Sequence, residues 1–198
     1  MLIVFLTIVA CGCASGPAWK RQTFAFSLPA DPPSTHSTQR ITALSRVSIS
    51  PLFQSRSFTY RTSENSYEQD PYAGFLIPPE RALAESIRAL MRANGAFGCV
   101  LEPGSGITPT LIMEVSINEL YGDFRKPSGP LGTMGLHVIC CEVQDDLPRR
   151  VVFDKFCSRE TPLARRTPSA LMAAWDADLQ EIINEISSNY ANTAINSR

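Results

Sequence analysis

Side chains that could perform acid–base or metal chemistry are few in this sequence, and they lie far apart. His36 stands in a stretch rich in proline and hydroxyl residues, and His137 stands in a segment that alternates apolar and polar residues. Asp145 and Asp146 are adjacent carboxylates in a stretch typical of a solvated turn. The sequence motifs of serine hydrolases, zinc proteases, nucleotide-binding loops and Cys-x-x-Cys metal sites are absent. We therefore expect no catalytic residue, no cofactor and no bound metal.

Cys11 is the residue whose surroundings indicate a definite chemistry. Residues 1–10 are apolar except for Thr7, and they end in Ile8-Val9-Ala10 directly before the thiol. Ten helical residues span about 15 Å, about half of a bilayer core, which is the length of a signal-peptide apolar region and too short for a membrane span. Two branched residues, a small residue and a cysteine form a bacterial lipobox, in which the thiol takes the lipid. The sequence thus predicts lipidation of Cys11.

Two alternatives to this interpretation follow from the same residues. No Lys or Arg precedes the apolar run, as it does in most signal peptides, so the true start could lie upstream. A buried apolar N-terminal strand would also explain the run. Cys13 is a second candidate for the lipid, although no branched residue stands three positions before it.

Charge and composition describe an ordinary globular chain. Among 198 residues there are 18 Lys and Arg and 19 Asp and Glu, and the formal net charge of −1 argues against a nucleic-acid-binding protein. The apolar fraction of 44% is enough for one sizeable core. The length favours a single domain over two.

Alternating apolar and polar residues predict strands over 23–28, 41–50, 57–61, 97–101, 111–117, 134–143 and 151–156. Residues 29–38 hold three prolines and read as a surface loop or tether, and residues 62–74 are polar and read as a long loop.

Two segments have the 3.6-residue period of amphipathic helices. Residues 80–94 follow Pro79 and end before Gly95, and the second helix begins at Thr167-Pro168. We expect its apolar stripe to be buried against a sheet; it consists of Leu171, Met172, Trp175, Leu179, Ile182, Ile183, Ile186 and Tyr190.

Consecutive strands without helices between them favour an α+β fold. We predict a two-layer sandwich with a mostly antiparallel or mixed sheet and two amphipathic helices on one face. The expected organisation is a lipoprotein signal peptide at 1–10, a lipidated N-terminus with a first strand and a loop at 11–40, one α+β domain at 41–192, and a tail at 193–198.

Four other cysteines lie in or directly beside predicted strands: Cys99, Cys140, Cys141 and Cys157. A disulfide from Cys99 to one of the other three would suit an oxidising periplasm, and simple core packing of the four is the alternative. A hairpin centred near Leu147 would place Cys157 opposite His137.

A set of short motifs is spread over most of the chain, from about Thr23 to Tyr190. They are Tyr60-Arg61, Tyr72, Phe75-Leu-Ile-Pro-Pro79, Asn94-Gly-Ala-Phe97, Pro162-Leu163 and the Ala173-Ala174 pair in the final helix. With these motifs and the position of its lipobox, the sequence resembles the ABC-type transport auxiliary lipoproteins, the PqiC/YmbA-like family. Phe75 stands where members often carry Trp.

This resemblance implies a function without chemistry of its own. Such lipoproteins work beside MCE-domain proteins and an ABC transporter that move lipid between the inner and outer membranes. The chain would then be anchored in the outer membrane on its periplasmic face, where it could form a ring of copies. Tyr67, Tyr72 and Phe75 are our candidate partner-binding residues, since aromatic residues are enriched in interfaces. A loop that folds over a sheet edge is the alternative explanation for them.

Two other classes of function stay open at this point. An envelope assembly or structural lipoprotein would have the same anchor and different partners. A secreted enzyme would need a deep polar pocket, and the sequence offers few residues to line one.

Overall fold

The computed structural model describes residues 20–29, 40–143 and 150–196, and side chains up to Tyr190. Cys11 and the predicted signal peptide lie outside the described residues. The elements in chain order are β1 Gln22–Phe24, β2 Ile41–Ile49, the 3₁₀ turn η1 Pro51–Phe53, β3 Ser57–Arg61, β4 Tyr67–Phe75, α1 Pro79–Asn94, β5 Cys99–Leu101, β6 Leu111–Asp123, β7 Leu131–Glu142, β8 Arg150–Pro162 and α2 Pro168–Asn196.

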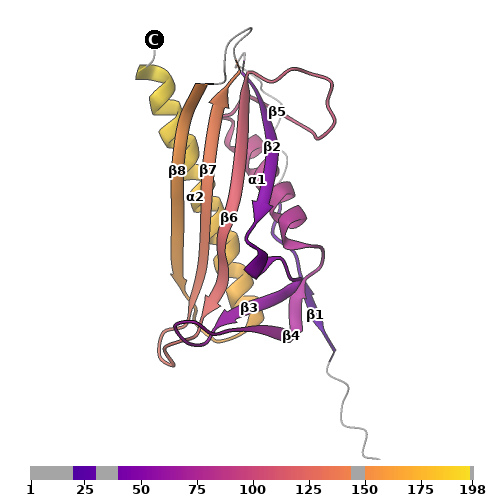
Figure 1. The fold of residues 1–198 in the computed structure, drawn as a ribbon, viewed down its shortest axis with the longest axis vertical. Helices are drawn as coiled ribbons and strands as arrows, with labels where there is room; N and C mark the ends of the chain where they lie inside the picture. Colours follow the sequence, from indigo (N-terminus) through magenta and orange to yellow (C-terminus); the bar gives the residue numbers. More distant parts are fainter. Residues whose placement is uncertain (1–19, 30–39, 144–149, 197–198) are drawn as a thin grey trace, which may run out of the picture.

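The strands form one mixed, open sheet with both helices on the same face, which confirms the predicted α+β class (Figure 1). β6, β7 and β8 make an antiparallel meander. β2 runs parallel to the first half of β6, whereas β3 runs parallel to its last residues. The sheet therefore forks along β6, and β3, β4 and β1 form a short arm at one end.

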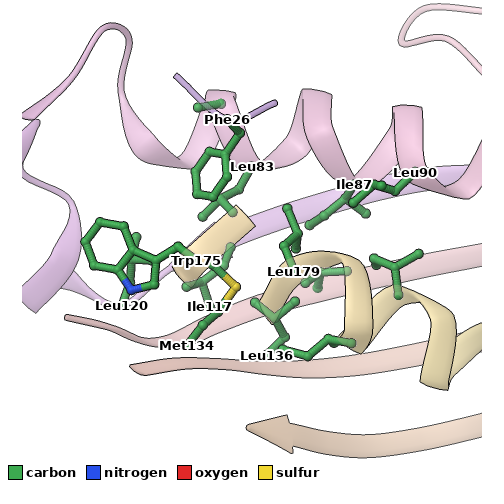
Figure 2. Packing of buried hydrophobic residues seen from close by; sticks show 14 of the residues in the cluster. Phe26, Leu83, Ile87, Leu90, Ile117, Leu120, Met134, Leu136, Trp175 and Leu179 are labelled. Atoms are coloured by element: carbon green, nitrogen blue, oxygen red, sulfur yellow. The ribbon is translucent and has the colours of Figure 1, made fainter. Parts of the chain in front are cut away.

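α1 begins and ends as the sequence predicts. Proline stands at its first position, where the missing N–H costs nothing, and Gly95 ends it with a left-handed φ of 73°. Its buried face holds Leu83, Ile87 and Met91, and Figure 2 shows Leu83 and Ile87 pointing toward the layer of α2 side chains.

α2 is capped by Thr167, whose Oγ1 accepts a hydrogen bond from the N–H of Ala170 at 3.3 Å. Every residue of the predicted apolar stripe is buried, from Leu171 to Tyr190. α2 lies across β7 and β8, with α1 beside it over β2 and β5.

Trp175 occupies the junction between α2 and the short arm of the sheet. Its ring stacks on Phe75 with centroids 5.6 Å apart and meets Phe58 edge-on at 5.0 Å. Its indole N–H donates to the carbonyl oxygen of Thr133 at 3.1 Å. Gly132 lets α2 approach β7, since a Cβ there would lie 2.9 Å from the Cβ of Ala174. Figure 2 places Trp175 near Met134 and Leu120 in this core.

The prediction of a long loop over 62–74 is wrong from Tyr67 onward, because β4 occupies Tyr67–Phe75. β4 pairs antiparallel with β3, and its last three residues also pair in parallel with β1. Its polar residues hid the strand: Asp70 accepts hydrogen bonds from the hydroxyl of Tyr60 at 2.6 Å and from the N–H of Tyr72 at 2.7 Å. Asp70, a polar residue of the predicted loop, thus links β4 to β3 through its carboxylate.

Several strand bounds also differ from the prediction. β6 and β8 run to Asp123 and Pro162, well past the predicted ends at 117 and 156, and β1 covers only Gln22–Phe24. The backbone of the polar residues at the ends of β6 and β8 pairs with β7. The strands therefore continue past the point where the alternation of apolar residues stops in the sequence.

The predicted pairing of Cys157 with His137 is wrong by one residue. Leu136 faces Cys157 and His137 faces Phe156. A hairpin centred on Leu147 would pair Glu142 with Val152, but Glu142 faces Arg150, and the bulge between the Cys140 and Cys141 pairs adds one residue to β8 and makes up only half of this difference. Cys157 consequently points into the core, where it is 3% exposed.

None of the four described cysteines forms a disulfide. Cys140 and Cys157 are buried, and Cys99 and Cys141 are half-buried, so the four pack as small apolar side chains. Burial raises the pKa of the Cys140 thiol to about 12, which keeps it uncharged.

Candidate interaction surface

The three candidate residues Tyr67, Tyr72 and Phe75 lie on one strand, β4, but in different environments. Phe75 is 2% exposed and belongs to the core beside Trp175, so its side chain is unavailable to a partner. Tyr67 is half-buried, with its ring edge-on to Tyr121 at 5.8 Å. Tyr72 is 50% exposed. β4 does not fold over the edge of the sheet as a loop would; it is itself a paired strand.

Tyr72 is followed along the chain by two further exposed apolar side chains. Leu76 is 54% exposed and Ile77 is 38% exposed. The backbone that carries them is fixed, since the N–H of Leu76 donates to the carbonyl oxygen of Phe24 at 2.7 Å and the Arg56 guanidinium donates to the Leu76 carbonyl. We call Tyr72, Leu76 and Ile77 the β4–α1 ridge. Exposed apolar side chains on a rigid backbone are typical of protein contact sites.

Leu76 and Ile77 are in the Phe75–Pro79 stretch that the sequence analysis singled out, yet only Phe75 was chosen as a contact residue. Phe75, Leu76 and Ile77 are three consecutive apolar residues, so no alternation distinguishes the buried Phe75 from the exposed Leu76 and Ile77. Of the ridge residues, the sequence analysis chose Tyr72 and missed Leu76 and Ile77.

An ion-pair cluster at the end of the β3–β4 arm is absent from the sequence predictions. The Arg125 guanidinium donates to Asp123 at 2.6 Å and to Glu64 at 2.7 Å, and Arg61 pairs with Glu64 at 3.1 Å. Hydrogen bonds from Arg125 hold the pKa of Asp123 below its usual range. The cluster joins the β3–β4 turn to the β6–β7 turn, two segments more than fifty residues apart in sequence.

The face of the sheet opposite the helices carries polar pairs. His137 Nε2 lies 2.6 Å from Asp154 Oδ1, and the hydroxyl of Ser116, which faces His137 in the β6–β7 register, lies 3.1 Å from that of Ser48. The side chains of His137 and Asp154 are 37% and 59% exposed. A histidine–carboxylate pair on an open sheet face has no walls to exclude water or to hold a substrate, so the geometry does not define an active site.

A groove of about 370 Å³ lies between α1, α2 and the segment that follows β1. Ser27 crosses it, and both its N–H and its hydroxyl donate to the Asp176 carboxylate, at 2.9 and 3.0 Å. Leu90 and Leu179 line its inner part. The carboxylate is thus occupied in holding the N-terminal segment to α2.

The described ranges, 20–29, 40–143 and 150–196, contain neither a metal-ligand cluster nor a membrane-spanning helix. No cluster of three or more His, Cys, Asp or Glu residues in these ranges could hold a metal ion. Neither helix, over the residues described, combines the length and apolar composition of a membrane span.

The stability that Glu185 contributes is expected to depend on pH. Glu185 accepts hydrogen bonds from Lys155 and from Arg159, the latter at 2.5 Å, and these contacts lower its pKa below the usual 4.5. A lowered folded-state pKa stabilises the fold above the unfolded-state pKa, and this contribution is lost as the pH falls through the folded-state value.

We therefore expect Glu185→Gln to lower the free energy of unfolding by about 0.5–1 kcal/mol at pH 7. The loss is small because the carboxylate is partly exposed and its charge is screened. The loss should shrink as the pH is lowered below about 4. Urea unfolding at several pH values measures it, with Glu181→Gln as the control because the Glu181 side chain is 67% exposed. An equal loss of unfolding free energy at low and neutral pH would show that Glu185 stabilises the fold through packing and not through its charge.

Comparisons with known proteins identify the fold. No protein-family model matches the sequence, and no curated protein matches it significantly. The structure is similar to that of protein XCC0632 from Xanthomonas campestris, of the family of unknown function DUF330, with a TM-score of 0.68 at 16% identity over 89% of this chain and 98% of that chain. It is also similar to an uncharacterized protein, with a TM-score of 0.69 at 9% identity over 86% of this chain and 98% of that one. At such identities the likeness shows a shared fold.

Proposed function

We propose that this protein is a non-enzymatic lipoprotein of the outer membrane that faces the periplasm. In this proposal it serves as the auxiliary component of an ABC-transporter and MCE-type system that moves lipid between the two membranes. The observation that carries the proposal is the lipobox at Ile8–Cys11, together with the resemblance to the auxiliary lipoproteins. The anchor would hold one end of a folded domain at the membrane, and the domain would bind the transport partner.

The fold supports a binding role. Neither the open sheet face nor the interhelical groove brings a nucleophile and a base together in an enclosed site, whereas the β4–α1 ridge offers exposed apolar side chains on a fixed backbone. The fold is shared over most of both chains with the DUF330 protein, so the domain architecture is one that other proteins also use.

We propose that the ridge contacts the MCE-domain partner, with Tyr72 as its largest side chain. Tyr72→Ser should weaken capture of the partner about tenfold, because loss of an aromatic contact at an interface costs more than 1 kcal/mol at the residues that matter. Pull-down from cells that contain the transporter, followed by titration of the purified partner, measures the change.

Two control variants make this test specific. Tyr72→Phe should bind almost normally, since the ring remains. Ile107→Ser replaces an equally exposed apolar residue far along the chain, 54% exposed, and should have no effect. Full binding by Tyr72→Ser would remove the ridge from the interface, and capture of unrelated envelope proteins in place of an MCE-domain protein would favour an assembly role.

A further inference from the structure

Three turns meet at the end of the molecule where β3 stops, and together they carry an excess of positive charge. They are residues 62–66, 124–130 and 163–167. Direct contacts join them: Arg125 bridges to Glu64, and the Arg166 guanidinium donates to the carbonyl oxygens of Phe124 and Lys126 at 2.6 and 3.3 Å. We call this joined group of turns the basic tip. It is one surface built from three separate stretches of sequence.

The charges of the basic tip do not cancel. Arg61 and Arg125 are matched by the carboxylates of Glu64 and Asp123. The remaining cations, Lys126, Arg165 and Arg166, make no ion pair within the described residues. Lys126 and Arg165 are exposed, so their charges face solvent.

Arg166 is held in place without being neutralised. Its guanidinium carbon lies 4.7 Å from the centre of the Phe124 ring, and that ring stacks on Tyr60 at 4.7 Å. Its hydrogen bonds go to backbone carbonyls, which carry no net charge. A cation fixed on an aromatic platform loses little side-chain freedom when it meets an anion, which favours binding of phosphate groups.

The N-terminal segment of the described chain lies at the same end of the molecule. Arg21 donates to the hydroxyl of Ser57 at 3.1 Å, and Ser57 begins the short strand β3, whose opposite end, Arg61, lies at the basic tip. Figure 1 shows β1 beside the β3–β4 arm at the lower end of the sheet, with the β6–β7 turn of the tip at the other side of that arm. On the proposed function, a lipid on Cys11 would tether the chain from this end.

We propose that the basic tip lies against the anionic phospholipid headgroups of the membrane in which the chain is anchored. This inference rests on the proposed anchor. Each basic residue near an anionic surface increases binding about fivefold, so three give about a hundredfold. Such weak attraction would not hold a free protein, but it orients one that is already tethered. The tip would thus turn the rest of the sheet and the helices away from the membrane.

The test replaces the natural anchor so that lipidation and the basic tip are examined separately. The full chain with Cys11→Ala and an N-terminal histidine tag is tethered to vesicles by a nickel-chelating lipid. The vesicles contain phosphatidylcholine with or without phosphatidylglycerol. Amide hydrogen exchange followed by mass spectrometry then reports which backbone segments the membrane protects.

We expect exchange in residues 124–130 and 163–167 to slow severalfold on the anionic vesicles, and high salt should remove this protection. The double variant Lys126→Glu and Arg165→Glu should abolish it, whereas Arg46→Glu, on an exposed residue of β2, should not. Unchanged exchange in β6 and β7 confirms that the variants fold.

Three outcomes would overturn the inference. They are equal exchange on neutral and anionic vesicles, protection that survives the double variant, and the same protection from inorganic phosphate without anionic lipid, which would indicate a site for the free anion. Protection that appears only when an acidic partner protein is added would assign the tip to that protein. None of these results bears on lipidation of Cys11, which is tested with the natural anchor.

Discussion

Replacing Trp175 by Ala is expected to lower the free energy of unfolding by about 3–5 kcal/mol. The indole is fully buried, it stacks on Phe75 and meets Phe58 edge-on, and its N–H donates to the Thr133 carbonyl oxygen. Removing it opens a cavity where α2, the meander and the β3–β4 arm meet, and it leaves a buried acceptor without its donor. Urea unfolding followed by circular dichroism measures the change.

Trp175→Phe provides the matched control for this prediction. The smaller ring keeps the aromatic contacts and loses the hydrogen bond, so we expect a cost of about 1–2 kcal/mol. If the free energy of unfolding of Trp175→Ala were within about 0.5 kcal/mol of that of the unchanged protein, the packing described around Trp175 would be incorrect.

The second large effect is expected at Gly74, at the centre of the β3–β4–β1 arm. A Cβ at this position would overlap the carbonyl oxygen of Arg56, a backbone atom that cannot rotate away. That oxygen also accepts a hydrogen bond from the N–H of Phe75 at 2.6 Å, so it cannot move without breaking the pairing of the arm. We expect Gly74→Ala to cost about 3 kcal/mol, at the upper end of the usual cost of overpacking.

Gly106→Ala is the control, because a Cβ there meets no atom within 4 Å. Its unfolding free energy should change by no more than about 0.5 kcal/mol. Thermal unfolding of the two variants gives the comparison. Similar melting temperatures for both would mean that β3 and β4 are not held as closely as the structure describes.

The helices could be predicted from the sequence because periodicity and caps carry the information locally. Pro79 and Gly95 bound α1, and the α2 stripe from Leu171 to Tyr190 is buried throughout. The first strands of the body, β2 and β3, also match the predicted ranges closely.

Other features could not be predicted because they depend on partners distant in the chain. β4 carries Glu68, Gln69 and Asp70, which read as loop, and only pairing with β1 and β3 makes it a strand. The bulge that shifts Cys157 by one register position leaves no mark in the apolar alternation.

The candidate surface was predicted in part. Tyr72 is exposed as a contact residue must be, whereas Phe75 is drawn into the core by Trp175, a contact across a hundred residues of sequence. The basic tip arises only when three turns meet, because no turn alone carries more than two basic residues.

Lipid labelling of Cys11 tests the central claim most directly, since the proposed location and the proposed partner both depend on a lipid anchor. The unchanged protein and Cys13→Ala should incorporate a fatty-acid analogue and fractionate with the outer membrane, and Cys11→Ala should do neither. Two or three acyl chains anchor a protein stably, because each buried CH₂ contributes about 0.8 kcal/mol. Label that persists in Cys11→Ala and disappears in Cys13→Ala would move the anchor to Cys13, and an unchanged protein that takes up no label would contradict the lipoprotein account.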